Sequence, residues 1–269
     1  MNFNVGDVLQ ARYDLFYVFA SYLVSVLGSF AALYHAQHMF RRDGTIKWSI
    51  AIGAAVALGG IGIWTMHFIG MMGYRLPLRV VYDGGLTVLS LIAAIVIAGI
   101  ALILAGGRGK FSKAGWLAGS LLAGAGVCVM HYMGMYAMNL RADMTLDLTR
   151  VAVSVVIAMT AAAAALWLAF HVVRNTHRIA AALVMGVAVC AMHYTGMSSA
   201  QFVCIASKQP PAWAIGGDNL PILVFAVTGM VLVVLSWNVL GLMATAGAAK
   251  AAAGTHGAPG AARIGIAKS

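Results

Sequence analysis

The chain has 269 residues, of which 62% are hydrophobic and 9% charged, and its mean hydropathy is +0.91. Soluble domains carry roughly 25% charged residues, so the composition excludes an ordinary soluble domain. The formal net charge is +10. Most basic residues fall in loops on one side of the expected membrane, a pattern that reports topology rather than nucleic-acid binding.

Seven apolar stretches follow one another, each close to the ~20 residues that span a bilayer. They predict an all-α integral membrane protein with one membrane domain, 15–243, between an outer segment, 1–14, and a flexible inner tail, 244–269. The apolar run after Arg12 is too long for a signal-peptide core, so we expect the first helix to be retained. The predicted helices are 15–39, 48–74, 84–106, 114–138, 149–172, 178–200 and 220–243.

The charges predict the orientation. With the N-terminus outside, the inner segments carry 11 of the 17 Lys and Arg residues, and Asp43 is their only acid. The positive-inside rule therefore predicts that the N-terminus is outside and the C-terminus inside.

One six-residue pattern, Met-His-aromatic-any-Gly-Met, occurs three times, at 66–71, 130–135 and 192–197. A helix precedes each copy. The three preceding helices open with Asp14, Asp83 and Asp147, each followed seven residues later by Ser21, Ser90 or Ser154, and Asp218 keeps the acid before the seventh helix. The unit is therefore a two-helix hairpin used three times. Parallel repeats are related by an axis along the membrane normal, which would bring the three motifs to one depth.

The motif places possible metal ligands on one helix face, because residues i and i+4 are neighbours there. The pairs are His67 with Met71, His131 with Met135, and His193 with Met197. The glycines between them, Gly70, Gly134 and Gly196, leave this face open to a neighbouring helix or a ligand. Met66, Met130 and Met192 point ~100° away and are candidates for another wall.

Imidazole and thioether are soft, neutral donors that suit Cu(I) better than Mg²⁺ or Ca²⁺, whereas zinc more usually takes a thiolate or carboxylate as well. A single buried histidine is often only a hydrogen-bonding residue between helices, and a single methionine is usually core filler. Three copies at matching depth favour a ligand role, since polar groups inside membranes tend to be functional.

Alternative roles are open for the aspartates and the cysteines. The three aspartates are interpreted as N-caps, with gating or metal access as the alternative. Cys128 and Cys190, three residues before a motif histidine, are interpreted as core residues or auxiliary ligands. Cys204 stands alone in an outer loop, and its role stays open because an odd cysteine count gives no disulfide framework.

The third motif reads Met192-His193-Tyr194-Thr195, which is the signature that names the MHYT domain, a bacterial integral-membrane sensor domain. The resemblance covers roughly residues 10–243. It departs from the signature in the first copy, with Phe68 and Ile69, and in the second, where Tyr132 is kept but Met133 replaces threonine.

The resemblance implies a copper site near the outer face of the bacterial cytoplasmic (inner) membrane that senses oxygen, carbon monoxide or nitric oxide. The ligands it implies are Met66, His67, Met71, Met130, His131, Met135, Met192, His193 and Met197. Family members are often fused to an output module, and the expected 26-residue tail is too short for one. A separate cytoplasmic or membrane effector is therefore expected.

We consequently expect a stand-alone membrane sensor and no enzyme, since no hydrolytic triad, phosphate loop or paired-carboxylate site is visible. A copper-binding or copper-handling membrane protein without signalling output is the alternative. A bis-His haem electron-transfer protein is disfavoured, because the pattern has three copies and companion methionines. The expected partners are the lipid bilayer and a diatomic gas, with no nucleic acid.

Overall fold

The computed structural model describes residues 3–209, 211–216, 220–222, 224–226, 228–229, 231–233, 235–238, 240–241 and 244. Within this part, seven helices are long and apolar enough to cross a membrane, so the predicted all-α, multi-pass membrane fold is confirmed. The seven spans are Leu15–His38, Trp48–Met72, Gly84–Gly106, Lys113–Tyr136, Leu148–His171, Asn175–Met197 and Leu220–Asn238. Asp218 and the predicted tail beyond Ala244 lie outside the described residues.

The spans present apolar side chains outward as well as inward. Leu89, Ile92, Val96 and Ile100 on α4 (Gly84–Gly106) are 46–52% exposed. Such a stripe, open to the surroundings along the length of a helix, is what a lipid-facing surface requires.

The second span departs from the regular helix that the sequence predicted. It consists of α2 (Trp48–Ala55), a π-helix η1 (Val56–Thr65) and α3 (Met66–Met72). Glycines bring this stretch against its neighbours: a Cβ at Gly59 would lie 2.3 Å from the Ala94 carbonyl oxygen of α4. A Cβ at Gly28 on α1 (Leu15–His38) would lie 2.4 Å from the Gly62 nitrogen. The first motif thus begins where the π-helix ends.

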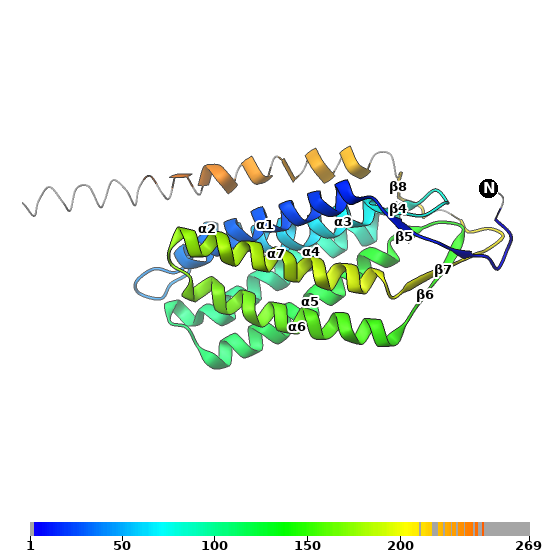
Figure 1. The fold of residues 1–269 in the computed structure, drawn as a ribbon. Helices are drawn as coiled ribbons and strands as arrows, with labels where there is room; N and C mark the ends of the chain where they lie inside the picture. The colour runs from blue at the N-terminus through cyan, green and yellow to red at the C-terminus, as the bar shows by residue number, and fades with distance from the viewer. Residues whose placement is uncertain are drawn as a thin grey trace, which may run out of the picture.

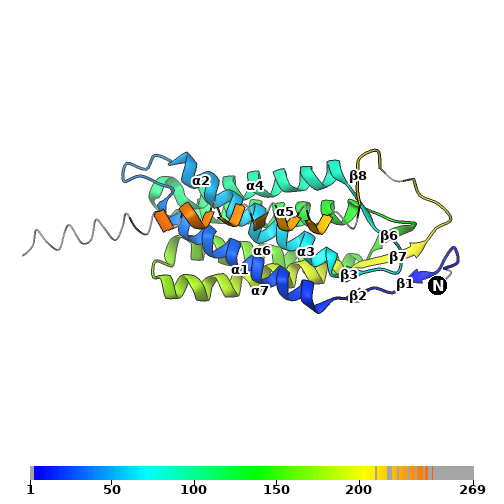
Figure 2. The same ribbon diagram turned by 90° about the horizontal axis from the view of Figure 1, so that it is seen from above.

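The helices of the three hairpins lie side by side in one bundle (Figure 1; Figure 2), and their contacts close a ring of six spans. Helices α1, α4 and α6 (Leu148–His171) alternate with the motif-bearing η1–α3, α5 (Lys113–Tyr136) and α7 (Asn175–Met197). Helix α1 packs between α7 and η1–α3, α4 between η1 and α5, and α6 between α5 and α7. Each non-motif helix therefore contacts two motif helices, as expected of three parallel repeats.

Short antiparallel strands cover one end of the ring, which we call the motif end (Figure 1). The loops predicted there contain β1 (Val8–Leu9), β2 (Arg12–Tyr13), β3 (Tyr74–Arg75), β4 (Val81–Asp83), β5 (Met138–Asn139), β6 (Ala142–Leu146), β7 (Ala200–Cys204) and β8 (Ala214–Gly216). The pairs β2–β3, β4–β5 and β6–β7 recur once per hairpin, while β1 adds to β7 and β8 to β4. The predicted outer segment thus contributes β1 and β2 to this cover.

The seventh span has no partner in the repeat and lies along the outside of the ring (Figure 1; Figure 2). Leu220, Val224 and Leu235 are buried on it. Thr228 Oγ1 lies 3.3 Å from Oγ1 of Thr65, the residue that precedes the first motif. The seventh span is therefore attached to the first repeat.

Candidate metal centre

The three motif histidines meet inside the ring. The side chains of His67, His131 and His193 are at most 1% exposed. Their Nδ1 atoms form a triangle with edges of 3.0, 3.1 and 3.4 Å. Among the described residues, this is the group of histidine, cysteine or acidic side chains placed to hold a metal ion.

The motif glycines determine how closely the rings approach. A Cβ at Gly70 would lie 2.4 Å from His193 Nε2. The same construction places Gly134 2.3 Å from His67 Nε2, and Gly196 2.3 Å from His131 Nε2. Each imidazole therefore lies on the glycine of a different hairpin, in cyclic order. The open face that the sequence predicted is occupied by the imidazole of a neighbouring hairpin.

The three imidazoles cannot satisfy all of their hydrogen-bonding groups within the cluster. A neutral imidazole has one N–H donor and one acceptor nitrogen. Each Nδ1 carries either a proton or a lone pair, so at least two of the three are alike, and either two N–H groups or two lone pairs face each other. The three Nε2 atoms are buried without a hydrogen-bond partner. With all three protons on Nε2, a cation among the Nδ1 atoms would accept the three lone pairs and remove this mismatch.

Serine–tyrosine hydrogen bonds support two of the motifs from the neighbouring helices. Ser21 on α1 pairs with the Tyr194 hydroxyl at 2.9 Å. Ser154 on α6 pairs with the Tyr132 hydroxyl at 2.7 Å. These serines are therefore interhelical hydrogen-bonding residues, and they fix the residue that follows the histidine.

The first repeat replaces this bond with a different donor. Phe68 has no hydroxyl, and the Trp64 indole donates to Ser90 Oγ on α4 at 3.0 Å instead. Trp64 occupies the position of Cys128 and Cys190 in the other repeats. This hydrogen-bonding role of Trp64 was not predicted from the sequence. The sequence does contain a signal for it. The first repeat differs from the other two at both positions, with tryptophan in place of cysteine and, four residues later, phenylalanine in place of tyrosine.

The three aspartates are N-caps, as predicted, and they also attach each helix to a motif helix. Asp14, Asp83 and Asp147 accept hydrogen bonds from first-turn backbone N–H groups of α1, α4 and α6. Their own backbone N–H groups donate to the carbonyl six residues after a motif histidine, with bonds Asp14 to Gly73 (2.9 Å), Asp83 to Ala137 (2.8 Å) and Asp147 to Ser199 (2.8 Å). Because the serine of each helix binds a different motif-bearing span, α1, α4 and α6 each bridge two of these spans.

The sulfur-containing candidates are all at least partly buried. The motif methionines Met66, Met71, Met130, Met135, Met192 and Met197 are at most 2% exposed. Cys128 and Cys190 are half-buried and Cys204 is buried, all three as free thiols. None of the three cysteines belongs to the histidine cluster of the described chain.

Two cavities approach the histidine layer from different directions. At the motif end, a cleft of about 210 Å³ is lined by Met71, Arg75, Tyr74 and Tyr82. Burial raises the pKa of both tyrosine hydroxyls, so they stay neutral.

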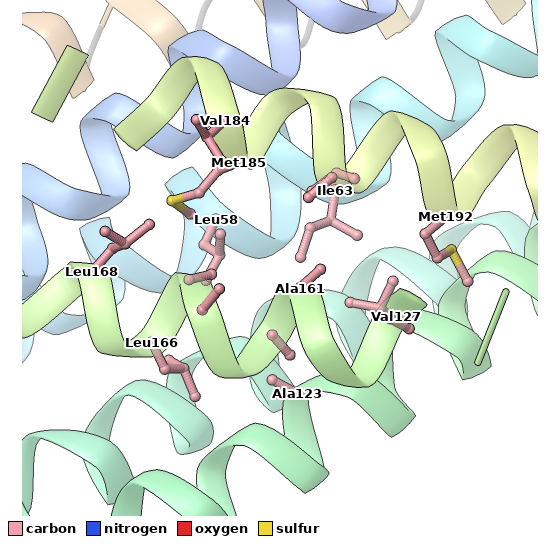
Figure 3. A pocket seen from close by; sticks show the side chains of 16 residues that line it. Leu58, Ile63, Ala123, Val127, Ala161, Leu166, Leu168, Val184, Met185 and Met192 are labelled. Atoms are coloured by element: carbon pink, nitrogen blue, oxygen red, sulfur yellow. The ribbon is translucent and has the colours of Figure 1, made fainter. Parts of the chain in front are cut away.

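The second cavity, of about 70 Å³, is apolar and lies between η1, α5, α6 and α7 (Figure 3). Leu58, Ile63 and Val127 line it, together with Met192 towards the motif end and Val184, whose side chain is 63% exposed.

These features define an integral-membrane helix bundle of three parallel hairpins whose equivalent histidines form one buried centre. The chain belongs to the MHYT family: the family model described as "Bacterial signalling protein N terminal repeat" matches residues 60–119 and 124–182. The recognition of the signature in the sequence is thereby confirmed.

Curated relatives share this region. The chain is 37% identical over 226 residues to the bifunctional diguanylate cyclase/cyclic di-GMP phosphodiesterase MucR of Pseudomonas aeruginosa, covering 82% of this chain and 33% of that protein. It is 30% identical to an uncharacterized signaling protein of Caulobacter vibrioides (86% and 28%), and 31% identical to the P. aeruginosa cyclic di-GMP phosphodiesterase NbdA (72% and 25%). The chain thus spans a third or less of these relatives. No solved structure matches it.

Proposed function

We propose that this chain is the sensory membrane domain of a bacterial signalling system, with one copper ion held by His67, His131 and His193. The observation that carries the proposal is the Nδ1 triangle, with edges of 3.0, 3.1 and 3.4 Å. A point equidistant from the three nitrogens lies about 1.8 Å from each, the mean edge divided by √3, close to the ~2.0–2.1 Å of a metal–imidazole bond. A haem has no space between rings this close together.

The donor set favours copper. Three neutral nitrogens in a buried site, with thioethers in the same motifs, suit Cu(I) better than hard cations. Copper bound there would supply a redox-active centre that coordinates oxygen, carbon monoxide or nitric oxide. The six motif methionines remain candidate ligands, those at His+4 lying on the same helix face as the histidines.

The apolar cavity supports a non-polar signal molecule. It runs from the lipid-facing Val184 to Met192, the residue before His193 (Figure 3). Diatomic gases dissolve in lipid, so this cavity would let them approach the histidine layer without crossing a polar surface. The cleft at Met71 is a second approach, from the motif end.

The protein's own contribution is mechanical. Each imidazole lies on the glycine of another hairpin, so a ring that moves must displace a second hairpin. The serine and aspartate bonds carry the displacement to α1, α4 and α6. We place the motif end on the outer side of the bacterial inner membrane, so the opposite end of the bundle lies on the cytoplasmic side. MucR and NbdA are named for enzymes that make or degrade cyclic di-GMP. We therefore infer that the sensor controls an enzyme of this kind.

Metal analysis of the purified protein tests this function. Copper should copurify at about one ion per chain, and His131→Gln should lose it while circular dichroism shows an unchanged helix content. His35→Gln is the matched control, because His35 is equally buried (2% exposed) but lies near the end of α1 that is opposite the motif end. A copper-free wild type, or equal copper loss in both variants, would refute the site. Bound copper with spectra insensitive to all three gases would instead favour copper handling.

A further inference from the structure

A cavity of about 500 Å³ lies at the end of the bundle opposite the strands, which we call the basic end. It is formed where α1, α4 and α6 end and α7 begins. Phe40, Phe111 and Phe170 supply apolar walls, and Arg41, Arg42 and Arg178 supply the charge. Its volume is in the range of sites that hold small organic ligands.

Arg178 is the unusual member of this lining. It is 5% exposed, and its guanidinium donates to Asn175 Oδ1 at 2.6 Å and to Gln37 Oε1. Its Cζ also lies 4.8 Å from the centroid of the Tyr34 ring. The Nε–H of Arg178 is buried and has no hydrogen-bond partner.

No acid of the described residues compensates this buried charge. In the described residues, no carboxylate is within salt-bridge distance of Arg178. The nearby acid Asp43 is not part of the lining and instead accepts from the backbone and hydroxyl of Thr45, at 2.9 and 2.7 Å. A buried cation without a counter-charge is strongly unfavourable, so the arrangement calls for an anion.

The start of α7 adds to the positive potential. Arg174, its N-cap residue, makes no side-chain cap, and the first turn contains no acid. Helix N-termini favour anions through their free N–H groups and the helix dipole. Arg178 lies in this first turn, so the dipole and the guanidinium act at the same place.

We propose that this cavity binds a phosphate ester, with the phosphate on the arginines and the apolar part of the ligand against the three phenylalanines. Guanidinium groups match phosphate oxygens with paired hydrogen bonds. The ligand is either a phospholipid headgroup, since the cavity lies where the spans end, or a soluble nucleotide. This site is separate from the histidine centre, and it does not depend on copper.

Native mass spectrometry of the full chain in detergent tests the lipid source, with phosphatidylglycerol compared against phosphate-free diacylglycerol. Equilibrium dialysis with adenosine monophosphate tests the soluble source. We expect one of the two phosphate esters to bind, about tenfold more weakly in Arg178→Gln, and diacylglycerol not to bind. Arg42→Gln provides a second lining variant at an exposed position, which keeps the test valid if Arg178→Gln misfolds.

Lys110→Gln is the control for general charge, because Lys110 is an exposed basic residue near the end of α4 that does not line the cavity. It should bind like the wild type. Selective binding of phosphatidylglycerol identifies a lipid headgroup site, and binding of adenosine monophosphate a soluble ligand. The proposal is overturned if neither ester binds, or if Lys110→Gln weakens binding as much as Arg42→Gln.

Discussion

Substitution of a motif glycine by alanine should damage a histidine in another hairpin. In Gly70→Ala, the new Cβ would lie 2.4 Å from His193 Nε2 and 2.9 Å from its Cδ2. Ordinary contacts need roughly 3.5 Å, so the ring must retreat by about 1 Å. Overpacking of this kind costs about 1–3 kcal/mol, against a gain of ~1 kcal/mol in helix propensity. The expected net loss in unfolding free energy is about 0–2 kcal/mol.

The functional loss should exceed the loss of stability. Ligands must be held within ~0.5 Å of their productive position, so copper content should fall sharply in Gly70→Ala. Histidine-selective NMR should show the largest change at His193, not at His67 of the same hairpin. The control is Gly60→Ala, whose Cβ would meet Ile95 at an ordinary 3.5 Å.

Unfolding in a denaturing-detergent titration and metal analysis measure both effects. Wild-type copper content in Gly70→Ala, or an equal loss in Gly60→Ala, would show that the glycines do not position the imidazoles.

The remaining predictions concern the bonds around the centre. Tyr132→Phe removes the 2.7 Å hydrogen bond to the α6 serine and should lower the unfolding free energy by ~1 kcal/mol. Tyr136→Phe, at a 58% exposed site on the same helix, should be neutral, and equal effects would contradict the assignment. Trp64→Phe removes the donor to Ser90, which should cost ~1 kcal/mol in the same titration. Asp147→Ala removes the N-cap of α6 and should cost about 0.5–2 kcal/mol, whereas Asp147→Asn should retain most of the stability. Similar losses in both would show that the carboxylate does not act as a cap.

The sequence predicted the repeat, the spans and the meeting of the histidines, because each depends on a pattern that recurs at nearly constant spacing. It did not predict which glycine receives which imidazole. That pairing depends on the order of the hairpins around the ring, and no local pattern encodes it. The bonds from the Asp14, Asp83 and Asp147 N–H groups were invisible for a related reason, since they join backbone atoms. The strands at the motif end are two to five residues long, too short for an alternating pattern.

The π-helix has a consequence for how the centre communicates. If the three hairpins were equivalent around one axis, the three histidines would have the same surroundings. A displacement of one histidine would then have the same effect as a displacement of either of the others. The first repeat breaks this equivalence: η1 leads directly into the helix of His67, and Thr65 at its end contacts Thr228 of the unpaired seventh span. His67 therefore lies two residues from a hydrogen bond to the seventh span, and this bond distinguishes the first repeat within an otherwise symmetric centre.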